Sequence, residues 1–337
     1  LYNIPWLIQI ASYTGCYGVS FFILCFTTLI TLILLNFRLR YLIIFVSAFS
    51  LYVCINLFLW VDYQAYFQST PHPRQAFTLI QPNLGWRESY YSFQGNFIFK
   101  KILNDLAVMA STVTPKLKDS TLFLPELTIS DFNFDNPLLI TTLSKILTNY
   151  QGLILGVRLD DKNTILSLNK QTHIQNIYIK SQLIPFFEND ETKSNQGNPL
   201  QISNSPLMLG AVLCYETLFP HLFRQLVRQN AHFIVGLSYN TWLGYSNWPL
   251  IHMAYMSFRA IENRRFAVFL NNHGPSSVVM ASGTINTHIP MGIRAGVSVS
   301  LPALERLSFY SRFGDWFVFG CFLIVFCNIT IFLMFFR

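Results

Sequence analysis

Three long uncharged stretches limit the folds that this chain can adopt. Residues 18–35 and 41–61 lie near the start of the sequence and residues 316–336 lie at its end, and none of them carries a charged side chain. About 20 predominantly apolar residues are enough for a helix to cross a bilayer, and aromatic residues near the ends favour spanning over burial in a protein core. We therefore predict that helices at both ends of the sequence hold the protein in a membrane.

The overall composition agrees with a membrane protein. Hydrophobic residues make up 52% of the 337 residues and charged residues only 12%, whereas about a quarter of an ordinary soluble domain is charged. The formal net charge of +7 is explained by contact with anionic lipid head groups. Because the sequence contains no run of basic residues, we expect membrane lipids as partners and no nucleic acid.

Positive charges predict the orientation of the chain. The short segment between the first two stretches contains Arg38 and Arg40, and Arg337 follows the last one. Loops rich in arginine and lysine stay on the cytoplasmic side of a membrane, so residues from about 62 to 315 are expected on the far side. In a bacterium this places them in the periplasm and the protein in the inner membrane.

We divide the chain into three parts. Residues 1–63 form a transmembrane region with helices at about 18–35 and 41–61, residues 74–310 a periplasmic catalytic domain, and residues 315–337 a C-terminal transmembrane helix. A polar, proline-bearing linker is expected at residues 64–73. The sequence begins with Leu1 and its first fifteen residues resemble a loop that enters a helix, so we expect the natural chain to begin further upstream.

Between the membrane stretches, apolar runs alternate with segments of helical periodicity, which predicts an α/β domain. The irregular residues 189–205 are rich in Asn and Ser and are interpreted as a flexible loop beside the site. We expect strands at 76–83, 120–126, 152–158, 164–168, 174–180, 207–214, 232–237, 266–271 and 276–281, and helices at 92–109, 136–150, 220–230 and 252–264.

Cys214 ends the apolar run 207–213, so a buried strand is expected to deliver its thiol to one edge of a sheet. A single free cysteine is most often a small buried hydrophobe. The other five cysteines lie in or beside the membrane stretches, which leaves Cys214 without a disulfide partner in the exported domain. In an oxidising compartment such a thiol has to be buried or used.

Glu126 and Lys180 each end another predicted strand. Taken singly, the carboxylate is explained as a charge at a helix N-terminus and the ammonium as a solvated strand residue. Together with Cys214 they form the set that acyl transfer needs. The carboxylate takes the thiol proton, the thiolate attacks a carbonyl carbon, and the cation with backbone N–H groups stabilises the oxyanion.

Four motifs carry a resemblance to the nitrilase (carbon-nitrogen hydrolase) superfamily, in particular to its apolipoprotein N-acyltransferase branch. Leu124-Pro-Glu126 resembles Trp-Pro-Glu of that family, and Cys214-Tyr-Glu216 matches its Cys-Tyr-Glu. Residues 180–188 resemble Lys-x-x-Leu-Val-Pro-Phe-Gly-Glu, and residues 238–244 resemble Ser-Asn-Asp-Ala-Trp-Phe-Gly. The chain departs from the family at Asn240, where the family has Asp, at His273, where it has Asn, and at Phe187, where it has Gly.

The resemblance implies a nitrilase-like αββα sandwich anchored by transmembrane helices, further membrane spans upstream, and neither a metal nor another cofactor. It also implies roles for seven residues. Glu126 is the general base, Lys180 the oxyanion stabiliser and Cys214 the nucleophile that forms a thioester. Glu188 orients the lysine or positions the base. Tyr215 and Glu216 shape the turn that follows Cys214, and the Tyr215 N–H is a second oxyanion donor. Trp242 gates the lipid-facing entrance to the site.

The activity implied by this branch moves a fatty acyl chain from a phospholipid to the N-terminal amine of a diacylglyceryl-cysteine lipoprotein. Two alternatives stay open. A membrane-anchored nitrilase-type amidase would use the same three residues but has no need for three hydrophobic anchors. A catalytically inactive membrane scaffold predicts the loss of at least one of the three, and all are present.

Overall fold

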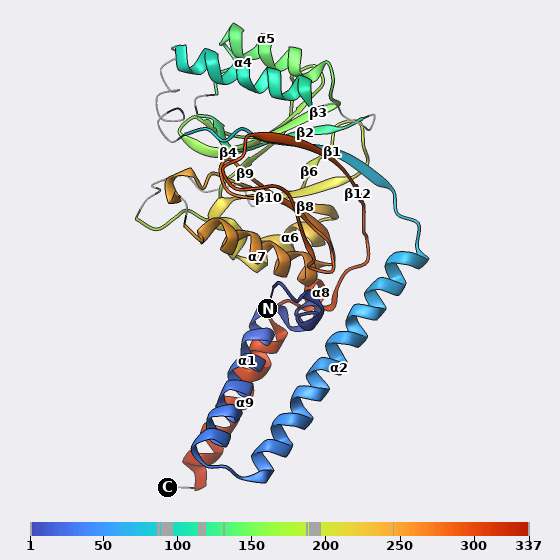
Figure 1. Cartoon of the computed structure of the whole chain (residues 1–337), viewed down its shortest axis with the longest axis vertical. Helices are drawn as coiled ribbons and strands as arrows, with labels where there is room; N and C mark the ends of the chain where they lie inside the picture. The colour runs from blue at the N-terminus through green and yellow to red at the C-terminus, as the bar shows by residue number, and fades with distance from the viewer. Residues whose placement is uncertain are drawn as a thin grey trace.

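The computed structural model describes residues 2–85, 88, 97–113, 119–130, 132–186, 188, 197–244 and 246–335 (Figure 1). Three helices extend from one end of a mixed α/β domain: α1 (Ala11–Leu35), α2 (Leu39–Ser69) and α9 (Trp316–Phe335). Each is long and apolar enough to cross a membrane, and only 11%, 17% and 0% of the residues in their most apolar segments are buried. Apolar side chains left exposed to this extent need a lipid environment. The predicted transmembrane helices are therefore confirmed.

The boundary of α2 differs from the prediction. We expected a span that ends near residue 61 and a linker at residues 64–73, but the helix continues to Ser69. Its last turns are held by the domain, because Tyr63 is only 5% exposed and the ring of Phe67 lies 5.8 Å from that of Phe266. A helix of 31 residues is about 46 Å long, so α2 extends beyond a hydrocarbon core of about 30 Å.

Helix α1 also begins earlier than predicted, and it is interrupted at Gly15. This glycine has φ 70°, and an added Cβ atom would lie 2.6 Å from a ring carbon of Tyr310. Only glycine fits this backbone without strain. The N–H of Cys16, released from the regular helix, donates to Oε1 of Glu262 at 2.8 Å. This bond joins α1 to α7 (Trp248–Asn263) of the domain.

Two six-stranded sheets form the centre of the domain (Figure 1). Their strand orders are β12-β1-β2-β3-β4-β5 and β11-β10-β9-β8-β7-β6. Helices α4 (Phe97–Thr112) and α5 (Pro137–Leu147) cover the first sheet, and α6 (Pro220–Arg228) and α7 cover the second. This arrangement confirms the predicted αββα sandwich. The strands are β1 (Arg74–Gln81), β2 (Thr121–Ile129), β3 (Gly152–Leu159), β4 (Lys162–Asn169), β5 (Ile174–Ile179), β6 (Leu200–Gln201), β7 (Met208–Leu213), β8 (Ala231–Ser238), β9 (Phe266–Asn271), β10 (Ser276–Val279), β11 (Ile285–Ile289) and β12 (Ala295–Pro302).

The main hydrophobic core lies between the two sheets. Phe77 of β1 packs edge-on against Phe123 of the neighbouring strand and against Phe233 of the opposite sheet, with ring centroids 5.2 and 5.1 Å apart. The central strands are buried on both faces, which explains why the sequence shows them as continuous apolar runs. Parallel pairing of β1, β2 and β3, and of β7, β8 and β9, brings the carboxyl ends of these strands to one edge of the sandwich.

Strands β6, β11 and β12 were not predicted. β12 pairs antiparallel with β1 along its whole length, from Arg74 opposite Pro302 to Gln81 opposite Ala295. Its residues Ala-Gly-Val-Ser-Val-Ser are small and only half-buried, so they make no apolar run. The expected loop 189–205 includes β6 at Leu200–Gln201. Residues 189–196 of that loop, and residues 92–96 of the helix expected at 92–109, lie outside the described residues.

Candidate active site

Cys214 lies at a sharp turn between β7 and the short 3₁₀ helix η3 (Cys214–Leu218). Its φ of 46° is in the left-handed region, which costs free energy for any residue other than glycine. The turn is held in place because the hydroxyl of Thr217 donates to the carbonyl of Cys214 at 2.8 Å. The Cys214 side chain is only 3% exposed. The apolar strand thus ends by presenting a thiol inside the molecule, at the edge where the strand ends of both sheets meet.

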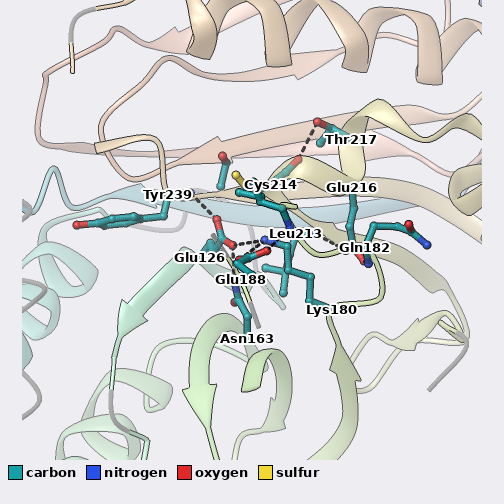
Figure 2. A network of polar contacts seen from close by, with 12 residues as sticks. Glu126, Asn163, Lys180, Gln182, Glu188, Leu213, Cys214, Glu216, Thr217 and Tyr239 are labelled. Atoms are coloured by element: carbon teal, nitrogen blue, oxygen red, sulfur yellow. Dashed lines mark hydrogen bonds and ion pairs between the residues drawn. The ribbon is translucent and has the colours of Figure 1, made fainter. Parts of the chain in front are cut away.

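Glu126 lies in β2, which is irregular at this point. The register with β3 shifts between Leu124 and Ile129, and an added Cβ atom at Gly156 would lie 2.4 Å from the Cα of Glu126. The glycine therefore makes room for the Glu126 backbone. Oε1 of Glu126 accepts a hydrogen bond from the Asn163 amide at 2.6 Å, and Oε2 accepts from the backbone N–H of Tyr239 at 2.8 Å (Figure 2).

Lys180 follows the end of β5 and is 3% exposed. Its Nζ lies 2.8 Å from Oε1 of Glu188 and 3.4 Å from Oε1 of Glu126 (Figure 2). Burial by itself lowers the pKa of this ammonium, but the charges of Glu126 and Glu188 outweigh it and raise the pKa well above its ordinary value. Lys180 therefore stays positively charged inside the site at neutral pH.

The Cys214 thiol is held in its neutral form. Burial raises its pKa to about 12, and the neighbouring Glu126 carboxylate acts in the same direction. Lys180 and a hydrogen bond with Ser238 lower the pKa of the thiol but do not outweigh burial. A thiol of this kind is not nucleophilic until a base removes its proton. The carboxylate of Glu126, which interacts directly with Cys214, is placed to do this.

Glu216 connects the two loops that carry Lys180 and Cys214. It is fully buried, and its Oε1 accepts hydrogen bonds from the Tyr178 hydroxyl at 2.7 Å and from the Ser181 N–H at 2.6 Å. The Ser181 hydroxyl and the Gln182 N–H also donate to this oxygen, while Oε2 accepts from the N–H of Leu213 at 2.7 Å. The carboxylate thus holds the end of β7 against the segment that follows β5.

The structure places the other predicted residues as follows. Glu188 accepts from the Ile184 N–H at 2.8 Å through its second oxygen, which fixes the carboxylate beside Lys180. Tyr215 lies within η3, and its ring packs edge-on against Phe219 with centroids 5.2 Å apart. Trp242 lies in η4 (Thr241–Leu243), after β8, and is 52% exposed. It is therefore not part of the buried cluster around Cys214.

Of the three departures from the family pattern, Asn240 lies beside the thiol. Oδ1 of Asn240 accepts from the Ser238 hydroxyl at 2.9 Å and lies 3.8 Å from Sγ of Cys214. Nδ2 of Asn240 is buried without a hydrogen-bond partner among the described groups, so it can donate to a group bound beside the thiol. His273 contacts Asn83 instead, at 2.6 Å. Phe187 lies outside the described residues.

No role at the site was predicted for Asn163, nor for Ser238, although Ser238 begins the motif at residues 238–244. Asn163 stands in the β3–β4 hairpin and Ser238 at the end of β8, and both are ordinary polar residues in the sequence. Only the tertiary fold brings them to Glu126 and Cys214. In the part of the chain that the structure describes, no three His, Cys, Asp or Glu side chains are grouped to hold a metal ion.

The comparisons with known proteins agree with this fold. The family described as Carbon-nitrogen hydrolase matches residues 123–292, slightly more than half of the chain. This chain therefore belongs to the carbon-nitrogen hydrolase family. Within that family it is similar to proteins named apolipoprotein N-acyltransferase. The relative from Thermotoga maritima is 24% identical over 94% of this chain, and the one from Treponema denticola is 22% identical over 97%.

The chain spans only part of these relatives, 62% of the length of the Thermotoga protein and 71% of the Treponema protein. Among solved structures, an amidase of the nitrilase superfamily from Nesterenkonia matches with a TM-score of 0.54 and 15% identity, over 74% of this chain and 99% of its own. A carbon-nitrogen hydrolase superfamily protein from Xanthomonas campestris has the same TM-score and 16% identity, over 72% of this chain and 95% of its own. At this identity the likeness shows the fold alone.

Proposed function

We propose that this chain is a membrane acyltransferase that moves a fatty acyl group from a phospholipid to the N-terminal amine of a diacylglyceryl-cysteine lipoprotein. The observation that carries the proposal is the buried thiol of Cys214 beside the Glu126 carboxylate and the Lys180 ammonium, in a domain joined to three apolar helices. The names of the relatives that match along the chain support the choice of substrates. In this proposal residues 74–310 are the catalytic domain and residues 1–63 and 315–337 anchor it.

In the first half-reaction, Glu126 takes the proton of Cys214 and the sulfur attacks the ester carbonyl carbon of a phospholipid. Lys180 and backbone N–H groups at the turn stabilise the oxyanion that forms. When this intermediate collapses, the C–O ester bond breaks and the leaving alkoxide takes the proton from Glu126. The products are a thioester on Cys214 and a lysophospholipid.

In the second half-reaction, the α-amine of the lipoprotein attacks the thioester carbonyl. Glu126 accepts a proton from the attacking amine, the C–S bond breaks, and the sulfur of Cys214 is protonated again. The product is an amide, and the enzyme returns to its starting state. Burial of the thiol favours this sequence, because water is kept away from the thioester until an amine arrives.

Mass spectrometry of the intact protein tests the proposal. After incubation with phospholipid alone, the mass should increase by one fatty acyl group on Cys214, and hydroxylamine should remove it. A diacylglyceryl peptide with a free N-terminus should discharge it as well. Cys214→Ser should not load, whereas the control Cys327→Ser, in the exposed face of α9, should load like the wild type.

Other outcomes would point elsewhere. Wild-type protein that transfers acyl groups without ever carrying one on Cys214 would overturn the thioester and leave direct transfer. Release of ammonia from small amides, with no acyl loading from phospholipid, would favour the amidase. A protein that does neither, although it is folded, would favour the inactive scaffold.

A further inference from the structure

A cavity lies beneath the sandwich, between the domain-side ends of α1 and α2 and the short helix α8 (Phe309–Phe313). Its volume is about 310 Å³, within the range of about 300–1,000 Å³ that is usual for small-molecule sites. None of the residues assigned above to the candidate active site lines it. The cavity is therefore separate from the candidate active site and has no role in the proposed acyl transfer.

The cavity carries an excess of positive charge. Arg264, Arg306 and Arg312 line it, and Asp62 is the one carboxylate among the described residues that do so. Asp62 lies 3.3 Å from Arg306 and neutralises one of the three cations. The excess of two positive charges is unusual in a partly enclosed space, because unpaired charges are costly to remove from water.

Arg264 is fixed in place by neutral groups. Its guanidinium donates to Oε1 of Gln9 at 2.7 Å and to the hydroxyl of Ser12 at 3.2 Å, and it lies over the ring of Tyr63, 5.0 Å from its centroid. Burial lowers its pKa to about 10, which leaves it charged at neutral pH. These contacts orient the guanidinium but do not neutralise it, so the charge remains available to an anion.

The cavity lies at the depth of the lipid head groups. Asp62 is 23 residues beyond Leu39, the first residue of α2, or about 35 Å along the helix. The hydrocarbon core is about 30 Å thick. Aromatic side chains of the kind found at membrane interfaces surround the site. Tyr66 lies under the guanidinium of Arg306 at 5.2 Å, and Tyr13 stacks on Phe309 with ring centroids 5.3 Å apart.

We propose that this cavity binds the phosphate of an anionic phospholipid in the leaflet on the side of the domain. Arginine side chains recognise phosphate oxygens through paired N–H groups, and two excess positive charges favour a head group with a net negative charge over a zwitterionic one. The apolar side chains that α1 and α2 expose can pack against the acyl chains. Inorganic phosphate offers the same oxygens but lacks those chains.

Binding to the full-length protein in neutral detergent tests the proposal. Short-chain phosphatidylglycerol, short-chain phosphatidylcholine and inorganic phosphate are titrated separately, with native mass spectrometry to count bound molecules. Phosphatidylglycerol should bind most tightly. The double variant R306Q/R312Q should weaken it about thirtyfold, at about 1 kcal/mol for each arginine. Asp62→Asn removes the negative charge and should strengthen binding, whereas the exposed Arg228→Gln, outside the cavity, should change nothing.

Each contrary result has a distinct meaning. Equal binding of phosphatidylglycerol and phosphatidylcholine would overturn the choice of an anionic head group. Inorganic phosphate that binds as tightly as phosphatidylglycerol would overturn the lipid in favour of a soluble anion. If Asp62→Asn does not strengthen binding, the cavity is not the site. This test does not depend on whether the double variant R306Q/R312Q folds. Acyl loading of Cys214 is measured in parallel, so that loss of this site is distinguished from failure of the proposed function.

Discussion

At the scale of single residues, the site combines a buried neutral thiol with a buried cation. A pKa of about 12 leaves Cys214 almost entirely protonated at rest, whereas Lys180 stays charged. A resting thiolate would react with any oxidant that entered, and a neutral thiol is protected from this. In the proposed mechanism the reaction therefore depends on transfer of the thiol proton, and Glu126 is the base that we propose for it.

Alkylation kinetics test this dependence on Glu126. Wild-type Cys214 should react with a small neutral alkylating reagent at neutral pH, because the carboxylate removes the proton. In Glu126→Gln only solvent hydroxide can do so. Loss of the carboxylate charge also lowers the pKa of the thiol, but burial, the largest cause of its raised pKa, remains. The reaction should be slow at pH 7 and rise about tenfold for each pH unit, since the thiolate fraction rises tenfold per unit below the pKa. Peptide mass spectrometry follows Cys214 separately from the other cysteines.

The matched control is Glu305→Gln, which changes an exposed carboxyl group and should leave the alkylation rate as in the wild type. If Glu126→Gln reacts at pH 7 as fast as the wild type, Glu126 is not the base.

At the scale of elements, α7 contacts both the second sheet and the membrane helix α1. One face packs under the second sheet, and the opposite side holds a fully buried ion pair in which Arg259 lies 2.9 Å from Glu262. Glu262 also accepts the N–H of Cys16 at the break in α1. A helix of the α/β domain is therefore joined to α1 through a charged pair that is fully buried.

Replacement of Arg259 tests this joint. Arg259→Leu leaves the Glu262 carboxylate buried without its cation and should lower the free energy of unfolding by about 3–5 kcal/mol. The double variant R259L/E262L removes both charges and should lose less than the single variant. Chemical denaturation in detergent measures both.

Arg294→Leu provides the comparison, because it breaks a partly exposed ion pair with Asp105 at 2.9 Å and should cost at most about 1 kcal/mol. A single Arg259→Leu variant as stable as Arg294→Leu would show that the buried pair does not stabilise the joint.

The sequence predicted those strands and helices whose own residues show a clear apolar pattern. The central strands were visible because burial on both faces makes them continuous apolar runs, and Glu126, Lys180 and Cys214 were visible as charged or reactive residues at the ends of such runs. β12 was missed because its small, half-buried residues form no apolar run, and its position depends on pairing with β1. Asn163 was missed because a hairpin delivers it to Glu126. The end of α2 was misplaced because contacts between Tyr63, Phe67 and the domain extend the helix.

At the scale of the whole molecule, the domain stands on one side of three helices, and the short turn between α1 and α2 lies at the opposite end (Figure 1). That turn contains Arg38 and Arg40. The positive-inside rule assigns it to the cytoplasm and the domain to the periplasm of a bacterium. This assignment is a proposal, because the fold itself is the same in either orientation.

Reporter fusions test the orientation. Alkaline phosphatase, which is active only after export, should be active when it is fused after Pro73 and inactive when it is fused after Arg38. A fluorescent protein that folds only in the cytoplasm should give the opposite pattern. Fluorescence from the fusion after Pro73 would reverse the proposed topology.

The pairing of β12 with β1 has a consequence for how the protein is made. The first strand of the domain borders on its last one, and residues 82–294 separate the two in the chain. The first sheet therefore keeps an open edge at β1 until almost the entire domain has been synthesised. A ribosome that stalls before residue 295 leaves a chain with an unpaired strand edge, which is a substrate for aggregation and proteolysis. Completion of the sheet thus comes shortly before the synthesis of α9, the long apolar helix that follows the domain.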